Sequence, residues 1–213
     1  MNETFSKLYN AILEGELAET KEAVQASLDA GLEPSQILSD GMIAAMNEVG
    51  KRFEEGDYFV PEMLVAARAM QGGLGLLQPY LVSSDVKSAG KVIIGTVKGD
   101  LHDIGKNLVK LMLEGAGFEV HDLGVDVQPG KFIEAIRVQG AQIVAMSALL
   151  TTTMPNMETT IKAIEEAGLR DQVKIIIGGA PVTDQYAQTI GADSFSPDAG
   201  QVASKVHELI RML

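Results

Sequence analysis

The stretch Lys91–Val109 reads KVIIGTVKGDLHDIGKNLV, and its pattern changes midway from that of a strand to that of a helix. The run Val92–Ile94 is apolar and β-branched, as in a buried strand, and it ends at Gly95. A polar loop follows, and from Ile104 onward apolar residues recur at helical spacing. Ligand sites in open α/β sheets gather at this carboxyl edge of the strands. The histidine in this loop, with a carboxylate two residues before it, therefore indicates a functional site.

The chain after this strand continues to alternate between strand and helix patterns. Apolar runs such as IVAMSAL and KIIIGG are nearly continuous, which is typical of parallel strands covered on both faces. Connections of helical length favour right-handed crossovers. The sequence therefore predicts an α/β domain, a Rossmann-like (flavodoxin-like), doubly wound parallel sheet of five strands. Strands are expected at 91–97, 118–124, 143–149, 174–179 and 193–195, and helices at 104–115, 129–139, 155–167, 181–190 and 198–212.

The first part of the chain, from about residue 4 to 81, has helical spacing throughout. Pro34 suits the first turn of one helix, and a turn at 56–61 precedes another that runs from Glu62 to about Leu77. About four helices with short connections predict a small N-terminal four-helix bundle. The polar segment SSDVKSAG at 83–90 is typical of a linker. We therefore expect a helical domain at 1–88 and an α/β domain at 89–213.

Composition excludes several classes of protein. The 213 residues carry a formal net charge of −12, which argues against a nucleic-acid partner because phosphate binding needs a basic footprint. The chain has no cysteine, so disulfides, zinc–thiolate sites and iron–sulfur clusters are excluded. No apolar run approaches the roughly 18 residues that span a bilayer, and the polar N-terminus is unlike a secretory signal. We expect a soluble, cytoplasmic protein with no membrane partner.

The sequence Asp100-x-His102-x-x-Gly105 suggests a metal ligand with its supporting carboxylate. A neutral imidazole that binds a metal through one nitrogen needs an acceptor for its other N–H, and Asp100 is close enough in sequence to provide it. A surface histidine paired with an acidic neighbour is the simpler alternative. One histidine cannot hold a bare metal ion, since three or four protein ligands are usual. A single axial histidine makes sense when a macrocycle such as haem or a corrin supplies the other ligands.

Two further stretches follow expected strands at the same sheet edge. Residues 147–153 read SALLTTT and are rich in small hydroxyl side chains, and 177–181 read IGGAP and lack side chains at two positions. Each alone is equally explained by ordinary turn chemistry. Together with the histidine loop they leave a slot between neighbouring loops for a flat ligand or an elongated ligand tail.

These motifs resemble those of a known family. The segment GTVKGDLHDIGKNLV closely resembles the DxHxxG signature of cobalamin-binding domains, SALLTT resembles the SxL segment that follows it, and IIGGA resembles the GG segment. The helical segment NEVGKRFEEGDYFVPEMLVAARAM resembles the four-helix cap of cobalamin-dependent methionine synthase and of small corrinoid proteins of methyltransferase systems. The resemblance covers nearly the whole chain.

The resemblance assigns a role to each motif residue. It implies that His102 is the lower axial ligand of cobalt, in place of the cofactor's benzimidazole base, and that Asp100 accepts the proton-bearing nitrogen of the ring. Thr153 stands where the family has a serine and keeps a hydroxyl that is able to bind Asp100. Further contacts to the cofactor are implied for Asp103, Gly105, Ser147, Leu149, Thr151, Gly178 and Gly179.

The helical part contributes a second set of expectations. Phe59 matches the cap aromatic over the upper, methyl-bearing face of the corrin, and Met63 on the following helix is expected to bind the cofactor with it. Met42, Met46 and Met70 are further methionines of this segment. Methionine either fills gaps in a small core or forms an adaptable surface over a flat ligand, and both interpretations remain open.

The implied function is that of a cobalamin-dependent methyl carrier, which moves a methyl group on cobalt from a one-carbon donor to an acceptor such as tetrahydrofolate or a thiol. The chain has no barrel domain, so the expected partners are a substrate-specific methyltransferase, an acceptor methyltransferase and a reductive activator. The alternatives are the small subunit of an adenosylcobalamin mutase, which generally lacks the helical cap, and a cobalamin-dependent regulator, which needs an output such as a DNA-reading helix. The sequence leaves the methyl donor open.

Overall fold

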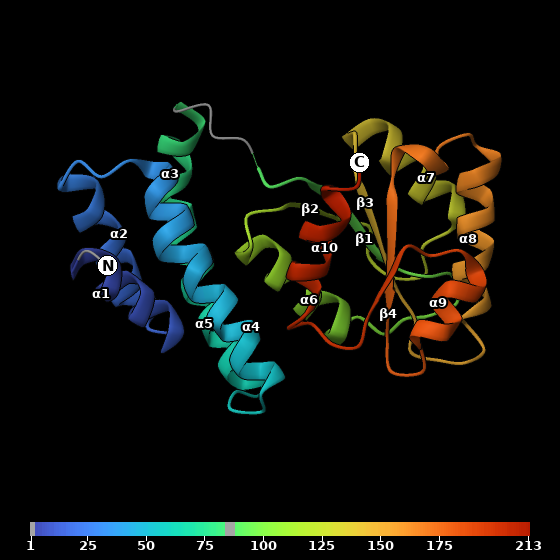
Figure 1. The fold of residues 1–213 in the computed structure, drawn as a ribbon, viewed down its shortest axis with the longest axis horizontal. Coiled ribbons are helices and arrows are strands. Elements are labelled where there is room, and N and C mark those ends of the chain that lie inside the picture. Colours follow the sequence, from blue (N-terminus) through green and yellow to red (C-terminus); the bar gives the residue numbers. More distant parts are fainter. Residues whose placement is uncertain (1–2, 84–87) are drawn as a thin grey trace. The chain divides into compact units, whose positions relative to one another are not determined.

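The computed structural model describes residues 3–83 and 88–213, and Figure 1 shows their fold. The chain divides into two compact units, which are described here one after the other. The first is Met1–Ser88 together with Gly115–Gly117, and the second is Ala89–Glu114 together with Phe118–Leu213. Most of the linker expected at 83–90 lies outside the described residues, so this linker stays a prediction.

Helices joined by short turns are the only regular secondary structure among the described residues of the N-terminal unit, as the sequence predicted. Helix α3 continues without a break through a π-helical stretch into α4, so the unit contains four helical rods within the described part of the chain. Within the π-helical stretch lies Gly41, where an added Cβ would stand 2.8 Å from Cδ2 of Leu8 on α1. The rods are α1 (Glu3–Leu13), α2 (Leu17–Asp29), α3 (Pro34–Gln36) with the π-helical stretch (Ile37–Ile43) and α4 (Ala44–Glu54), and α5 (Val60–Ser83).

Helix α5 is longer than expected at both ends. Its start is fixed by Glu62, whose Oε2 accepts a hydrogen bond of 3.0 Å from the N–H of Phe59. Pro61 is compatible with a first turn, where its missing N–H has no helical partner. The helix also continues through Pro79 to Ser83, because a proline near the end costs one main-chain hydrogen bond without stopping the last turn. Met42, Met46, Met63 and Met70 are at most 1% exposed, which fits gap-filling in a small core.

The second unit is a five-stranded sheet in the order β2-β1-β3-β4-β5, with every pair of neighbours parallel. This confirms the predicted doubly wound fold. In the register of the two central strands, Thr96 of β1 lies beside Ser147 of β3, which in turn lies beside Gly178 of β4. The strands are β1 (Lys91–Thr96), β2 (Glu119–Asp122), β3 (Ile143–Ser147), β4 (Lys174–Gly178) and β5 (Ser194–Ser196).

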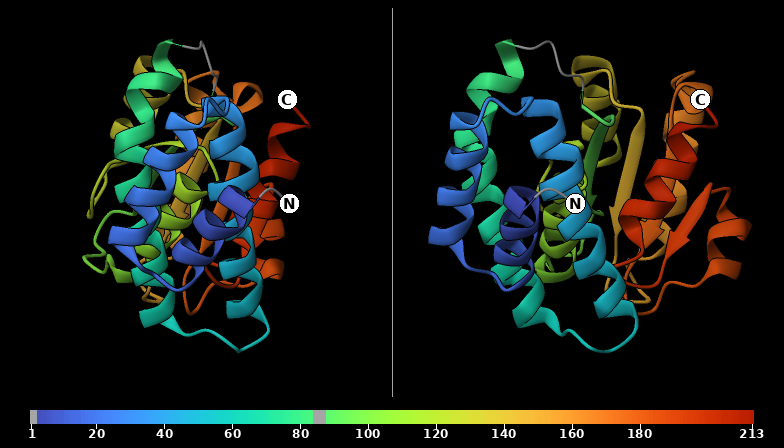
Figure 2. Two further views of the ribbon diagram at one scale, coloured as in Figure 1. Left: turned by 90° about the vertical axis from the view of Figure 1, so that its left-hand side faces the viewer. Right: turned by 60° about the vertical axis from the view of Figure 1, so that its left-hand side comes forward.

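Helices cover both faces of this sheet (Figures 1 and 2). One buried core joins alternate strand residues such as Ile93, Val144 and Ile175 to three helices on the same face. Phe132 is fully buried in this core, and an added Cβ on Gly95 would stand 2.9 Å from its ring. The helices of this face are α7 (Pro129–Gln139), α8 (Pro155–Glu166) and α9 (Asp184–Ile190), and those of the other face are α6 (Ile104–Gly115) and α10 (Val202–Ile210).

Several elements are shorter than the sequence predicted. Strands β1, β3 and β4 end one or two residues earlier, where the chain leaves the ladder and makes loops at the carboxyl edge of the sheet. Helix α9 begins at Asp184 because the hydroxyl of Thr183 caps it, accepting from the N–H of Tyr186 at 3.1 Å. Among the described residues, no helix has both the length and the apolar content that crossing a bilayer requires.

The buried position of Phe132 gives a test of the core. Replacing Phe132 by Ala removes a ring that is 0% exposed, so we expect the free energy of unfolding to fall by about 3–5 kcal/mol. The matched control is Val138→Ala on the same helix, where the side chain is 70% exposed and the expected loss is within about 0.5 kcal/mol. Urea unfolding of the cofactor-free chain measures both, and equal losses would contradict this packing.

Candidate functional site

The histidine loop lies where the strand order reverses. Strand β1 is central, with β2 on one side and β3 on the other, so the loops that follow β1 and β3 diverge toward helices on opposite faces. In open α/β sheets this is the place where ligands bind. The loop after β1 carries Asp100 and His102, and the loop after β3 carries Leu149, Leu150 and Thr153.

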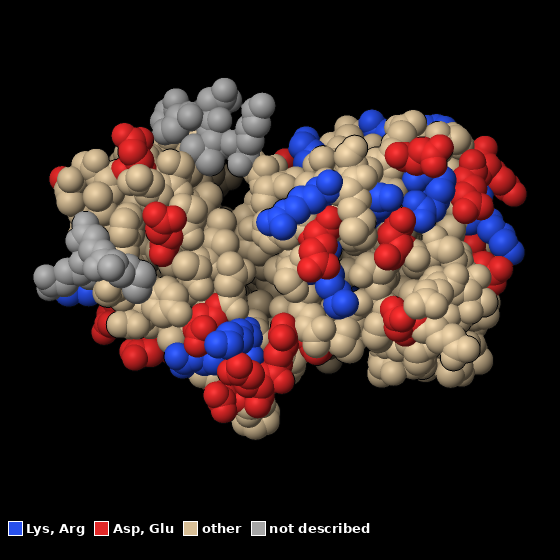
Figure 3. All heavy atoms as spheres, in the orientation of Figure 1, with Lys and Arg blue, Asp and Glu red and all other residues tan. Residues whose placement is uncertain are grey.

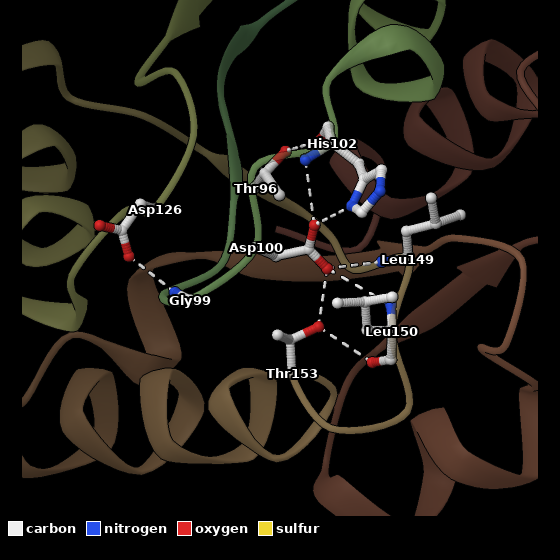
Figure 4. A network of polar contacts seen from close by, with 8 residues as sticks. All are labelled: Thr96, Gly99, Asp100, His102, Asp126, Leu149, Leu150 and Thr153. Atoms are coloured by element: carbon white, nitrogen blue, oxygen red, sulfur yellow. Dashed lines mark hydrogen bonds and ion pairs between the residues drawn. The ribbon is translucent and has the colours of Figure 1, made fainter.

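Asp100 joins these two loops through its carboxylate, which is completely buried (Figure 4). Oδ1 accepts from Nδ1 of His102 at 2.8 Å and from the main-chain N–H of His102 at 3.1 Å. Oδ2 accepts from the N–H of Leu149 at 2.8 Å and from Oγ1 of Thr153 at 2.7 Å, with the N–H of Leu150 farther away at 3.4 Å. One carboxylate therefore binds donors from residues about fifty positions apart in the sequence.

These donors determine the charge of Asp100. Burial by itself raises the pKa of a carboxyl group, but hydrogen bonds from the Thr153 hydroxyl, the Leu149 N–H and His102 outweigh it and hold the pKa of Asp100 far below its ordinary range. Asp100 is therefore ionised at neutral pH and is able only to accept hydrogen bonds.

The ionised carboxylate fixes the state of the histidine ring. Because Oδ1 of Asp100 accepts only, Nδ1 of a neutral His102 must carry the ring proton, and Nε2 keeps its lone pair. The side chain of His102 is 51% exposed, so the ring reaches out of the loop while its inner nitrogen stays bound. The main chain is fixed as well, since the buried hydroxyl of Thr96 donates to the carbonyl of His102 at 2.9 Å. The arrangement is that of a metal-ligating histidine with a supporting carboxylate.

Thr153 makes the hydrogen bond to Asp100 that the resemblance implied. It is 6% exposed, and its Oγ1 lies 2.7 Å from Asp100 and 2.9 Å from the carbonyl of Leu150. The extra methyl group of threonine, relative to serine, points toward Gly99, where an added Cβ would stand 3.7 Å away. The hydroxyl thus reaches Asp100 without a clash of the methyl group.

Exposed apolar side chains lie on the same two loops as the histidine and its partners. Leu101 and Ile104 are 71% and 81% exposed on the same loop, and Leu149 and Leu150 are 40% and 41% exposed on the neighbouring one. Gly105 opens the same region, since a Cβ added there would meet no atom within 4 Å. An exposed imidazole nitrogen among apolar side chains and free space suits a large, flat, mostly apolar macrocycle whose metal needs one axial ligand. The residues present therefore fit a corrin.

The other predicted contact residues divide into two groups. Ser147 and Gly178 are half-buried neighbours at the ends of β3 and β4, and Thr151 and Asp103 are exposed on the two site loops. Gly179 has a φ of +133°, and an added Cβ would overlap the carbonyl oxygen of Ala148. Close contact with the chain after β3 is thus sufficient reason for this glycine, and its contact with a cofactor stays a prediction.

The two predicted residues of the helical unit differ in exposure. Phe59 immediately precedes α5 and is 65% exposed, whereas Met63, one turn further on, is fully buried. Their contacts with the cofactor remain predictions.

The sequence did not reveal several residues that hold the loops together. Asp126, in the loop after β2, accepts from the N–H of Gly99 at 2.7 Å. Lys106 is 3% exposed, and its Nζ lies 2.8 and 2.7 Å from the two carboxylate oxygens of Asp122 at the end of β2. The sequence contained only a weak indication of these contacts. Aspartate is among the few residues that tolerate a positive φ, and a lysine on the inner face of a helix needs a partner.

Comparison with known proteins agrees with this geometry. The sequence matches the B12 binding domain family over residues 90–203, and a second B12 binding domain family over residues 4–78. Trimethylamine corrinoid protein 1 of Methanosarcina acetivorans is 43% identical over 210 residues, which cover 98% of this chain and 97% of that protein. The dimethylamine corrinoid protein of Methanosarcina barkeri is 44% identical over 189 residues, or 88% and 89% of the two chains.

A solved structure agrees as well. The chain aligns with one in the methanol:cobalamin methyltransferase complex of Methanosarcina barkeri with a TM-score of 0.87 and 27% identity, over 100% of this chain and 81% of that one. The protein therefore belongs to the family of B12-binding corrinoid proteins, with a helical B12-binding cap followed by a B12-binding α/β domain. This confirms the family, the cofactor and the fold that the sequence motifs predicted.

The low pKa of Asp100 predicts an acid-dependent loss of stability. A carboxyl group whose pKa is depressed by folding contributes its full stability above its ordinary pKa of about 4. That contribution falls as the pH drops toward the folded-state pKa, by at most about 1.4 kcal/mol per pH unit. Asp100→Asn should remove this part of the pH dependence of unfolding, which is called the acid slope below. It should also lower the free energy of unfolding at pH 7 by about 1–3 kcal/mol, because the buried donors around residue 100 then face an amide instead of a carboxylate.

Two variants of Thr153 provide the matched comparison. Thr153→Ser keeps the donor to Asp100 and should keep the acid slope, whereas Thr153→Val removes the donor and should make the slope shallower. Urea unfolding of the cofactor-free chain at several pH values between 3 and 7 measures both. An acid slope that is the same in the wild type and in Asp100→Asn would show that Asp100 is not held in its ionised form.

Proposed function

We propose that this protein is a corrinoid methyl carrier that binds its cobamide with His102 as the lower axial ligand. The observation that carries the proposal is the bond between Nδ1 of His102 and the ionised, buried Asp100, because it leaves the Nε2 lone pair available on an exposed ring. When bound, the cobalt of the corrin carries the methyl group that donor and acceptor exchange.

The chain's own residues support this function in three ways. Asp100 orients the ring and holds its proton on the side away from the metal. Leu101, Ile104, Leu149 and Leu150 provide an apolar surface around the ring, and burial of their exposed area favours binding of a large macrocycle. Gly105, Gly178 and Gly179, with Ser147 and Thr151, are proposed to accommodate the nucleotide tail.

The helical unit is proposed to cover the opposite face of the corrin with Phe59. A cover of this kind excludes water from the reactive side and must move aside when the methyl group is transferred. The proposed domain division near residues 83–90 would allow that movement. The exposed ring of Phe59 and its position at the start of a helix support the assignment.

The methyl donor is proposed to be a methylated amine. Proteins named as trimethylamine and dimethylamine corrinoid proteins are 40–44% identical to this chain and are covered over most of their length, whereas the chain in the methanol complex is 27% identical. The values for the trimethylamine and dimethylamine proteins are nearly equal, so the proposal is the class of donor rather than one amine.

The partners follow from the proposed role. A substrate-specific methyltransferase must supply the methyl group, a second methyltransferase must accept it, and a reductive activator must return oxidised cobalt to its active state. The structure of the methanol:cobalamin methyltransferase complex provides the precedent for pairing with a substrate methyltransferase. On the face shown in Figure 3, acidic and basic side chains are interspersed, which suits contact with other proteins better than contact with nucleic acid.

Axial ligation is tested by removing the imidazole. His102→Ala, reconstituted with methylcobalamin, should lose the absorption spectrum of the histidine-ligated cofactor and bind it more weakly. The matched control is His121→Ala, which removes an exposed imidazole from β2 and should leave spectrum and affinity unchanged. If His102→Ala and the wild type gave the same methylcobalamin spectrum, His102 would not be the ligand.

The donor class is tested with partner enzymes. The chain, loaded with reduced cobalamin, is mixed with a trimethylamine, a dimethylamine or a methanol methyltransferase and the matching substrate, and methylation of cobalt is followed by absorption. We expect methylation with an amine system at a rate at least about 10-fold above that with methanol, which corresponds to about 1.4 kcal/mol of discrimination. Faster methylation with methanol would contradict the proposed donor.

A further inference from the structure

The loop after β2 holds the histidine loop although none of its residues belongs to a cofactor motif. Asp126 has a φ of +51° and is the one residue other than glycine with a positive φ in the described part of the chain. Its Oδ1 accepts from the N–H of Gly99 at 2.7 Å, and its own N–H donates to the carbonyl of Asp100 at 3.0 Å. Figure 4 shows the bond to Gly99 beside the network of Asp100. Asp126 thus binds the main chain at two points, the N–H of Gly99 and the carbonyl of Asp100, which flank the peptide bond between these residues.

The choice of side chain at this position is informative. A glycine would adopt a positive φ without steric cost, whereas an aspartate adopts it at some cost in free energy. What aspartate adds is a side-chain oxygen that accepts from the N–H of Gly99 at 2.7 Å. Gly99 itself has a φ of +80°, so both partners of this bond occupy the backbone region that favours glycine.

The same loop holds the chain on the other side of His102. Asp122 binds the buried ammonium of Lys106 on α6, and its Oδ1 also accepts from the N–H of Gly124 at 2.9 Å. The pKa of Asp122 is lowered: burial raises it, but the bonds from Lys106 and Gly124 outweigh burial. Lys106 also donates to Oδ1 of Asn107 at 2.7 Å. The loop at 122–126 is therefore attached both before and after the histidine.

These attachments bear on the geometry of the site. The carboxylate of Asp100 must present one oxygen to His102 and the other to the loop after β3, so a small rotation of its main chain would break one set of bonds. The histidine loop has other attachments, from Thr96 to the carbonyl of His102 and from Asn156 to the carbonyl of Lys98 at 2.9 Å. The N–H of Asp100 also donates to the carbonyl of Val97 at 3.1 Å. None of these three bonds reaches the N–H of Gly99 or the carbonyl of Asp100, the two groups that Asp126 holds.

We propose that Asp126 is a positioning residue for the pair Asp100–His102. By holding the peptide at Gly99 and Asp100 it keeps the carboxylate on Nδ1 of His102, and so sets how readily Nε2 is available to a metal. This inference rests on the proposed axial role of His102. Asp126 acts through the main chain and does not contact the cofactor.

Two variants separate the hydrogen bond from the backbone conformation. Asp126→Gly tolerates the positive φ but lacks the acceptor, whereas Asp126→Asn tolerates the same φ and keeps an Oδ1 for Gly99. The full chain is labelled with ¹⁵N-histidine without cofactor. Its three histidines are assigned with the His102→Ala variant, and the ring shifts report which nitrogen of His102 carries the proton. The same variants are then loaded with methylcobalamin, and the ligated fraction is read from the absorption spectrum.

We expect Asp126→Gly to increase the ratio of Nε2–H to Nδ1–H tautomer, and of unligated to ligated cofactor, by about 3- to 10-fold, the effect of one lost hydrogen bond. Asp126→Asn should stay within about 2-fold of the wild type. Urea unfolding accompanies each measurement. If Asp126→Gly lost only stability, with unchanged ring shifts and spectrum, Asp126 would be merely structural and the proposal would be wrong. Equal changes in both variants would also overturn it, because they would show an effect of charge.

The two readouts distinguish this inference from the proposed function. If the wild type bound methylcobalamin with the same spectrum as His102→Ala, axial ligation would be wrong, and the ring shifts of the cofactor-free chain would still decide whether Asp126 positions His102. If the wild type showed histidine ligation and Asp126→Gly had the same ring shifts and the same spectrum, the proposed function would be supported and the proposed role of Asp126 would be wrong.

Discussion

The site depends on one buried negative charge. Asp100 is completely buried and still ionised, because donors from His102, Leu149 and Thr153 replace the water that it loses. A protonated Asp100 would offer its own proton, and the histidine ring would no longer be obliged to keep its proton on Nδ1. The donors on Oδ2 of Asp100, from Leu149 and Thr153, therefore help to keep the lone pair of His102 on Nε2.

The fold supplies those donors because of its strand order. Only neighbouring parallel strands bring their carboxyl ends together, and β1 and β3 are neighbours although α6, β2 and α7 separate them in sequence. Both strands stop at the sheet edge, so the N–H groups of Leu149 and Leu150 point at Asp100 instead of another strand. The loops diverge beyond that point, which leaves the outer side of the histidine ring open to a ligand.

The sequence was informative where a pattern is local. Apolar runs separated by helical patterns predicted the five strands and their parallel direction. The spacing of Asp100 and His102 predicted their contact, since two residues in an extended loop place a carboxylate within reach of the ring. The contact of the Thr153 hydroxyl with Asp100 was implied by the resemblance to cobalamin-binding domains. Strand ends were placed one or two residues late because apolar residues such as Leu149 continue past the last ladder bond, and periodicity does not record where a main-chain N–H finds its acceptor.

Contacts that depend on backbone conformation or on distant pairing could not be predicted in this way. Asp126 lies 27 residues after Gly99, and nothing in the segment GVDVQPG indicates that its carboxylate meets that N–H. Lys106 follows the histidine motif directly and would be taken for an exposed residue at the start of a helix, yet it is buried against Asp122. Removing one partner of such a buried pair leaves an uncompensated charge, so the pair makes any movement of α6 relative to β2 costly. The motif residues form the proposed ligand site, and Asp126 and Asp122 restrict where those residues lie.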